Sequence, residues 1–425
     1  MSLAFADEPP AADDAGVAAG ADAAPAPNAG EPAPPVDAPV DEHAGKKHDK
    51  KHDKKHDQDL PDGPASDALP AAGQSSTTKP RKQKKKKHGK LAFGGRLFAR
   101  AAAVKEKTAP DFVAQETLNS ARAKAVYRWH ELTAELQVEF ATKVKIKNAF
   151  AQLRLADAAT KVDVRAGNFK MPFSAIQMTS LWTLPMADRG LLDNVLVKRL
   201  QVAGRAIGGM LVVELPGAWS PELRAGVFQG VDDAGVPITA PAKDRFGQDG
   251  SLRLSAKPAH GFELGISGQA RVGELQVVPV KVSRGYAGEL DATLSTAAGP
   301  GALRVWVEGM LGTSWLVTGN DPMHTRARFT EGRGIAAYRL GGADHGHRYV
   351  ELYGQFGALD PDASIRHDLV IEATGGLTYG ASGAWRIQAE LERWQVGSNA
   401  PIGIVELGIG PSTSTTILVQ LGARL

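Results

Sequence analysis

Arginine and lysine are the side chains of this 425-residue chain whose spacing points to chemistry. Arg96 and Arg100 fall on one face of an alternating segment, and Arg122 and Arg128 fall on one face of the next. Arginine presents a rigid fork of N–H donors that suits phosphate and carboxylate, and rings of Arg or Lys select anions in pores. We therefore predict a path for small anions, lined by Arg128, Arg165, Lys170, Arg189, Lys198, Arg199, Arg205 and Arg224.

A structural role is the alternative for Lys170, Arg189 and Arg205. These side chains could form salt bridges with acids such as Asp188 or Asp193 instead of contacting ions. Acidic residues also alternate onto the polar face, and the net charge of the chain is only +3. We therefore expect any selectivity to be mild. The acids concerned are Glu135, Glu139, Glu390 and Glu392.

Patterns typical of enzymes are absent from the sequence. There is no cysteine, which excludes disulfides, iron–sulfur clusters and thiol catalysis. No G-x-S-x-G, H-E-x-x-H or phosphate-binding G-x-x-x-x-G-K-S/T motif occurs. His345 and His347 flank Gly346 beside Asp344, which indicates a surface hairpin more than a metal site. We expect no catalytic residue and no cofactor.

A histidine repeat stands near the N-terminus. Lys-Lys-His-Asp occurs three times in succession over 46–57. His48, His52 and His56 could bind a divalent metal loosely together with the aspartates. Nothing in such a segment fixes ligand geometry, so a solvated low-complexity linker is the favoured interpretation.

The region 7–90 differs from the rest of the chain in composition. It is rich in Ala, Pro, Asp, Gly and Lys and contains no Trp or Tyr, so we predict a disordered tail. Its lysine cluster near 79–90 would pair with anionic lipid or the cell wall, since an exported protein does not meet nucleic acid. Ala4-Phe5-Ala6 has the small-x-small pattern of a signal-peptidase site, so 1–6 is interpreted as a signal-peptide remnant. A chance alanine-rich start is the alternative.

From Leu91 to the C-terminus the chain reads as a series of alternating segments. In 262–272, apolar or small residues take every second position, and Glu263, Gln269 and Arg271 lie between them. The pattern predicts about sixteen strands in 91–425, separated by turn signals such as Gly341-Gly342. They lie near 92–104, 119–129, 134–140, 146–155, 162–170, 205–214, 222–230, 251–258, 262–272, 286–295, 302–311, 332–340, 347–357, 368–379, 385–392 and 417–425.

These strands can cross a membrane only as a closed barrel. No run of 18 apolar residues exists, which excludes a transmembrane helix. Strands of about ten residues match a tilted membrane crossing, and a charged face can line a water-filled lumen. The fold class predicted is all-β, a transmembrane antiparallel β-barrel of about 16 strands.

One stretch resembles a known family. Residues 164–173 read Val-Arg-Ala-Gly-Asn-Phe-Lys-Met-Pro-Phe, and Gly204-Arg205-Ala206-Ile207-Gly208 and 224–230 (Arg-Ala-Gly-Val-Phe-Gln-Gly) follow. This order resembles the phosphate-selective porin O and P family over 162–230. Asn168 and Asp188 stand where that family usually has Gln and Glu. The resemblance implies a 16-stranded outer-membrane barrel, a homotrimer, passive passage of small anions, and a loop near 171–200 folded inward as a constriction.

The sequence thus favours a bacterial outer-membrane porin for small hydrophilic solutes, with a mild preference for anions such as phosphate and a tail in the periplasm. Two alternatives remain. One is a structural barrel whose basic tail tethers it to the cell wall or anionic lipid. The other is a soluble all-β binding protein with a basic arm.

Overall fold

The computed structural model describes residues 89–106, 111–141, 144–198, 200, 202–229, 248–275, 281–313, 328–342, 346–400 and 413–424. All of them belong to one unit, Pro61–Leu425. The predicted signal-peptide remnant 1–6, the tail up to residue 88, the metal candidates His48, His52 and His56, and His345 lie outside the described residues.

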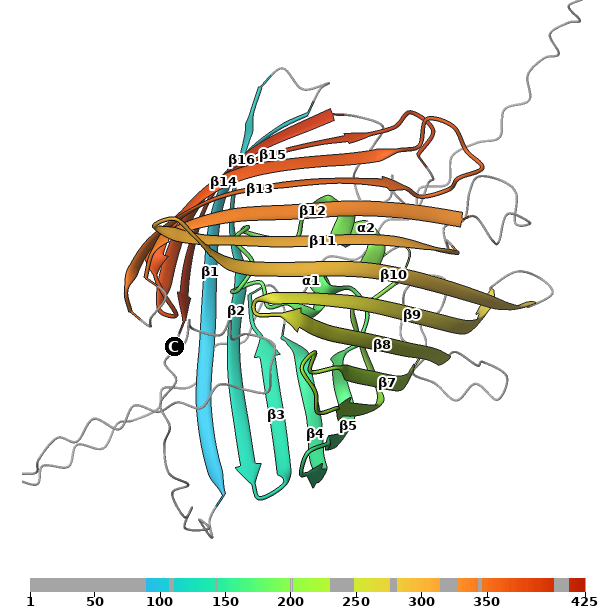
Figure 1. Cartoon of the computed structure of the whole chain (residues 1–425). Coiled ribbons are helices and arrows are strands. Elements are labelled where there is room, and N and C mark those ends of the chain that lie inside the picture. Colours follow the sequence, from blue (N-terminus) through green and yellow to red (C-terminus); the bar gives the residue numbers. More distant parts are fainter. Residues whose placement is uncertain are drawn as a thin grey trace, which may run out of the picture. The chain divides into compact units, whose positions relative to one another are not determined.

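Sixteen antiparallel strands form a single closed barrel, in which each strand pairs with its neighbours in the chain and β1 pairs with β16 (Figure 1). Closure leaves no free sheet edge, so the backbone hydrogen bonds are satisfied within the sheet. The strands are β1 Lys90–Glu106, β2 Val113–Trp129, β3 Leu132–Glu139, β4 Lys145–Asp157, β5 Lys161–Lys170, β6 Arg205–Glu214, β7 Glu222–Gln229, β8 Gln248–Ala259, β9 Phe262–Leu275, β10 Lys281–Ala298, β11 Gly301–Thr313, β12 Arg328–Gly341, β13 Arg348–Asp360, β14 Val370–Ala381, β15 Trp385–Val396 and β16 Thr413–Arg424.

Short turns join the strands at one end of the barrel. Between Ala259 and Phe262 only His260 and Gly261 intervene, and Gly261 has a φ of 71°. Tight hairpin turns need such left-handed backbone, which glycine adopts without a steric penalty. Longer connections, including 171–204, join the strands at the opposite end, which is the arrangement of outer-membrane barrels.

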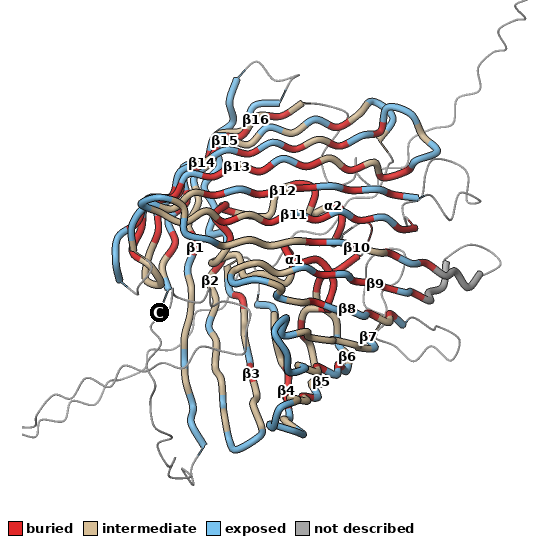
Figure 2. The backbone as a smooth tube through the Cα atoms, in the orientation of Figure 1, coloured by how far each residue is buried: buried red, intermediate tan, exposed pale blue. Residues whose placement is uncertain are grey.

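Buried and exposed residues alternate along the strands (Figure 2). On β12, Phe329, Glu331 and Arg333 point inward and are buried, and Thr330 points outward. Large apolar side chains are exposed on the outside of the barrel, such as Leu254, Ile266, Leu290, Leu311, Leu352, Leu377, Leu391 and Leu421. In the described part of the chain, no helix is long and apolar enough to cross a membrane.

The predicted barrel and its sixteen strands are confirmed. Several strands extend beyond the predicted limits, most clearly β2, which begins at Val113 instead of near 119. Its first residues pair with 99–104 of β1 although both faces of this segment are exposed. Backbone pairing continues here where the apolar alternation has ended, so periodicity alone could not locate the strand end.

The connection 171–204 between β5 and β6 enters the barrel, and we call it the inner loop. It contains two short helices, α1 Ala175–Met178 and α2 Gly190–Lys198, which the sequence analysis did not predict. Leu192, Val195 and Leu196 of α2 are fully buried and pack with wall residues such as Phe329 and Leu359. The inner loop is thus held inside the barrel by an apolar core of its own.

Candidate functional site

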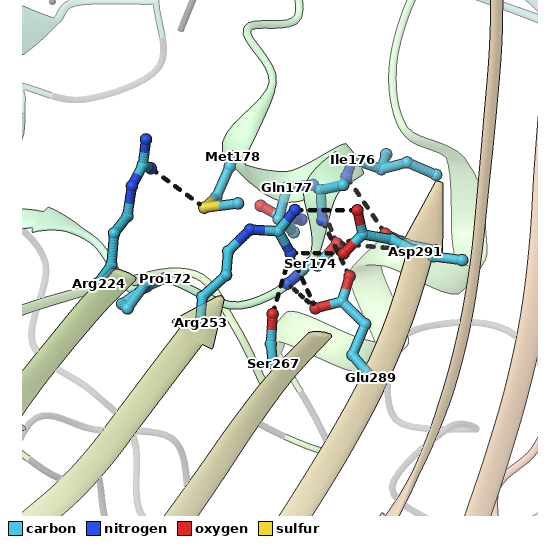
Figure 3. A network of polar contacts seen from close by, with 12 residues as sticks. Pro172, Ser174, Ile176, Gln177, Met178, Arg224, Arg253, Ser267, Glu289 and Asp291 are labelled. Atoms are coloured by element: carbon cyan, nitrogen blue, oxygen red, sulfur yellow. Dashed lines mark hydrogen bonds and ion pairs between the residues drawn. The ribbon is translucent and has the colours of Figure 1, made fainter. Parts of the chain in front are cut away.

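The inner loop binds the lumen face of β8–β16, which we call the anchoring wall. At its start, Ser174 N donates to Glu289 Oε2 at 2.6 Å and Ala175 N donates to Glu289 Oε1 at 3.0 Å (Figure 3). Ser174 Oγ and Ile176 N donate to Glu308 at 2.9 and 3.2 Å. The first N–H groups of a helix have no partner within it, and carboxylates of the wall take that role here.

Side chains of the anchoring wall also form hydrogen bonds with the backbone of the second half of the inner loop. Ala187 N donates to Glu390 Oε2 at 3.0 Å, and Leu192 N donates to Glu372 Oε2 at 2.9 Å. Arg386 of β15 donates to the carbonyl oxygens of Leu181, Trp182 and Leu184 at 2.9–3.0 Å. Charged wall groups thus satisfy both the donors and the acceptors of loop backbone, which fixes the loop position.

Buried ion pairs stabilise the anchoring wall itself. Arg333 Nη2 lies 2.5 Å from Glu308 Oε1, and both side chains are 0% exposed. Arg253 pairs with Asp291 at 2.5 Å, and Arg304 pairs with Glu351. Pairs of this kind are costly to break, because either partner alone would be an uncompensated buried charge.

The lumen face of β1–β7, which we call the basic wall, is built differently. Arg96 stands directly opposite Arg122 in the strand register, and Arg96, Arg122, Arg189 and Arg205 are close enough to repel one another. Lys147, at a bulge of β4, is within electrostatic range of Arg122 and Arg205. All five side chains are half-buried. Like charges held together favour an anion among them.

The partners of these cations are mostly neutral. Arg205 Nε donates to Asn148 Oδ1 at 3.0 Å, and Arg96 lies 5.4 Å from the centroid of the Phe98 ring. Arg122 is the exception, with Glu139 at 2.6 Å. Among the described residues no carboxylate pairs with Arg96, so its positive charge is left for other ligands.

Two predicted pathway residues hold the inner loop instead. Lys170 Nζ donates to Met178 O at 2.9 Å, and Arg189 Nη2 donates to Thr179 O at 2.5 Å. Burial lowers the pKa of Arg189, and Asp193 offsets part of that effect. Arg189 therefore has the structural role that the alternative expected, with loop carbonyls as its hydrogen-bond partners in place of Asp188 or Asp193, and Arg205 donates to Asn148.

Asp188 and Asp193 pair with wall residues. Asp188 lies 2.9 Å from Arg100 of β1, and Asp193 lies 3.4 Å from Arg333 of β12. These two acids therefore connect the inner loop to two separate parts of the barrel wall, β1 and β12.

The other predicted residues lie in several places. Arg165 donates to Gln152 at 2.6 Å beneath the Phe150 ring, and Arg224 pairs with Glu222 at 2.6 Å. Arg128 is half-buried on β2. Lys198 belongs to α2, and Arg199 lies outside the described residues. The structure thus brings Arg189 and Arg205 together with Arg96, Arg122 and Lys147, and it does not gather the whole predicted set.

The anchoring acids Glu289, Glu308 and Glu372 were not singled out from the sequence. Their position on the lumen face follows from alternation along β10, β11 and β14. Their loop partners are more than a hundred residues away, and no local pattern links them. Among the described residues no group of three or more His, Asp or Glu could hold a metal ion.

Comparisons with known proteins identify the fold. No family profile matches the sequence, and no curated protein does. An anion-selective porin from Comamonas acidovorans aligns with a TM-score of 0.51 and 10% identity over 80% of this chain and all of its own. The outer membrane channel DcaP of Acinetobacter baumannii aligns with a TM-score of 0.51 and 10% identity over 81% of this chain and 99% of its own. This chain therefore has the fold of outer-membrane porins.

Proposed function

We propose that this protein is a bacterial outer-membrane porin for passive diffusion of small hydrophilic solutes, with a mild preference for anions such as phosphate. The observation behind the preference is the half-buried group Arg96, Arg122, Lys147, Arg189 and Arg205, gathered where the basic wall faces the inner loop. Glu135 and Glu139 lie on the same wall and pair with Lys124 and Arg122, which keeps the preference mild.

The outer surface of the barrel supports membrane insertion. Its exposed side chains are large and apolar on most strands, including Leu254, Ile266 and Leu290. A soluble protein rarely exposes a continuous apolar surface of this extent, whereas lipid covers one without cost. This is the reason to prefer the porin over a soluble all-β binding protein.

The outer face of β1–β5 supports the expected homotrimer. Its outward side chains include several small ones, such as Ala101, Ala123, Ala151 and Ala166, all exposed. Large apolar side chains, including Phe93, Leu136 and Leu153, are exposed on the same strands, so this face can pack against the apolar surface of a second barrel. Light scattering in detergent, corrected for bound detergent, would give a mass three times that of the chain. The periplasmic tail and its lipid or cell-wall contacts remain proposals for residues outside those described.

Reversal potentials in planar bilayers test the selectivity. Under a KCl gradient the wild type should show a small potential of the sign that anion preference requires. The double variant Arg96→Glu with Arg205→Glu replaces two positive charges on the basic wall and should move the potential towards cations. An unchanged potential would remove both residues from the ion path.

Arg348→Glu provides the matched control, because Arg348 is exposed on β13 and its described contact is Tyr379. It should leave the potential at the wild-type value. The earlier candidate Arg189 is less suitable, since its substitution would also disturb the inner loop.

A structural barrel with a closed lumen is the second candidate. The buried apolar core around α2 favours it, because a firmly packed inner loop could block the barrel. A folded barrel, verified by its heat-dependent gel mobility, that gives no ion current would establish this candidate and exclude the porin.

A further inference from the structure

A cavity of about 420 Å³ lies inside the short-turn end of the barrel, against the inner loop. Wall residues from β5 to β11 and the loop residues Ala175, Met178 and Thr179 line it. Ligand sites usually measure about 300–1,000 Å³, so this cavity suits a small molecule. It lies apart from the cation group around Arg96, none of whose members lines it.

The charged lining carries both signs. Each cation has an acid nearby, whereas the described residues provide no ion-pair partner for Arg96 or Arg205. Lys161 lies 2.8 Å from Glu214, Arg224 lies 2.6 Å from Glu222, and Lys257 lies 3.9 Å from Glu263. A simple anion entering here meets three acids, Glu214, Glu222 and Glu263, beside the bases, whereas a molecule carrying both charges meets a complement for each.

Arg224 has the donors for a carboxylate. Its Nε is engaged by Glu222, whereas Nη1 donates to the sulfur of Met178 at 3.5 Å (Figure 3). A thioether is a weak acceptor. A carboxylate would be a much stronger partner for this guanidinium, which is only 23% exposed.

Glu263 provides the opposite charge. Its carboxylate lies 3.9 Å from both Lys257 Nζ and Arg253 Nη2, so neither contact is a close hydrogen bond. Lys257 is 62% exposed and can move away, and Arg253 is already bound by Asp291. An ammonium group could therefore reach Glu263 without breaking a strong pair.

The uncharged lining has an apolar part beside several Ser and Thr residues. Met178, Leu215 and Trp306 contribute to this apolar part, together with Ala159 and Ala175. This surface can cover an aliphatic side chain.

From these three features we infer that the cavity is a solute-binding subsite for small zwitterions of the amino-acid type. The ligand has a carboxylate for Arg224, an ammonium for Glu263 and an apolar side chain, as in an amino acid or a dipeptide. The inference rests on the proposed channel function, because the ligand must enter the lumen.

The dipeptide alanyl-leucine, added to the full-length protein in planar bilayers, tests the subsite through concentration-dependent interruption of the ion current. N-acetyl-alanyl-leucine lacks the ammonium and alanyl-leucine amide lacks the carboxylate. We expect half-maximal block by alanyl-leucine at a concentration about tenfold lower than by either analogue, the ratio given by one additional charged contact.

Two variants test the contact of Arg224 with the carboxylate and the contact of Glu263 with the ammonium. Arg224→Gln should abolish the advantage of alanyl-leucine over the amide, and Glu263→Gln should abolish its advantage over the acetylated peptide. Arg348→Gln, at the same end of the barrel but outside the cavity, should change neither. Heat-dependent gel mobility would verify that each variant is folded.

Three results would overturn the inference. Equal block by all three peptides would show a non-specific obstruction. Equal block by alanyl-leucine and its acetylated form, with loss only in Arg224→Gln, would show a simple anion site. A normal ion current that alanyl-leucine does not interrupt would exclude the subsite and leave the porin function intact, whereas absence of any current would refute the porin function itself.

Discussion

The two walls of the barrel lumen use the same residue types for different purposes. On the anchoring wall, Arg253, Arg304 and Arg333 are nearly fully buried and each is paired with a carboxylate. On the basic wall, Arg96 and Arg205 are half-buried, and their described partners are an aromatic ring and an amide. Arginine therefore secures the structure where acids accompany it and provides positive potential where they do not.

The inner loop makes this difference possible. Its backbone donors occupy Glu289, Glu308, Glu372 and Glu390, and these acids are thereby withdrawn from the lumen. Part of the negative charge of the barrel thus binds the loop, whereas the described residues provide no ion-pair partner for Arg96 and Arg205 on the basic wall. The small net charge of the chain thus hides a strong local asymmetry.

Removing a buried ion pair of the anchoring wall should cause the largest loss of stability. Arg333→Met leaves Glu308 buried without its cation and should lower the free energy of unfolding by about 3–5 kcal/mol. Loss of the inner-loop position should also raise the conductance. Thermal unfolding in detergent, followed by circular dichroism, measures the first effect, and bilayer recordings measure the second.

A substitution on the basic wall serves as the comparison for Arg333→Met. Arg96→Met removes a cation that is surrounded by other cations, so its cost should stay below about 1 kcal/mol. Equal destabilisation by the two variants would mean that the two walls do not differ as described. The double variant Arg333→Met with Glu308→Gln should recover part of the lost stability, as expected for a coupled pair.

A glycine at the start of α2 gives the second prediction. Gly190 has a φ of 79°, and a Cβ there would overlap the carboxylate of Glu372, which accepts from Leu192 N. Gly190→Ala should cost about 1–3 kcal/mol and loosen the inner loop, detectable as faster proteolysis within 171–204. Gly217 also has a positive φ, but a Cβ there meets nothing within 4 Å. Gly217→Ala should therefore cost less; an equal cost would mean that backbone strain alone explains the effect.

The smallest change in folding stability is expected from a substitution in the connection 361–369, away from both walls. Burial, together with Asp360, raises the pKa of Asp368 to about 6. The folded state therefore favours the protonated carboxyl of Asp368. The contribution of this protonation to folding stability is fully present below the ordinary pKa of about 4 and is lost as the pH rises through about 6. Asp368→Asn should raise stability by about 1 kcal/mol at pH 8 and leave it unchanged at pH 3. A gain of the same size at both pH values would contradict titration of Asp368 as the cause.

Much of the barrel follows from the sequence alone. Alternation in 262–272 and 385–392 assigned inward and outward residues correctly, because side-chain direction in a strand has a strict period of two. The strand number followed from the same rule. The loop 171–200 was expected to fold inward from family resemblance, and Pro172 ends the preceding strand.

Only the tertiary structure decided which charged side chains are held in ion pairs or by the inner loop and which keep their charge available to the lumen. Arg165, Arg189 and Arg205 look alike in the sequence, yet Arg165 binds Gln152, whereas Arg189 and Arg205 both join the group around Arg96. Within that group Arg189 holds loop carbonyls and Arg205 donates to Asn148. These outcomes depend on residues far apart in the chain, such as Ser174 and Glu308, and on the helices of the inner loop. The sequence determines which face of a strand a side chain occupies, because that is a local property of the backbone. Its electrostatic role is set by whichever partner closure of the barrel and insertion of the loop bring within a few ångströms.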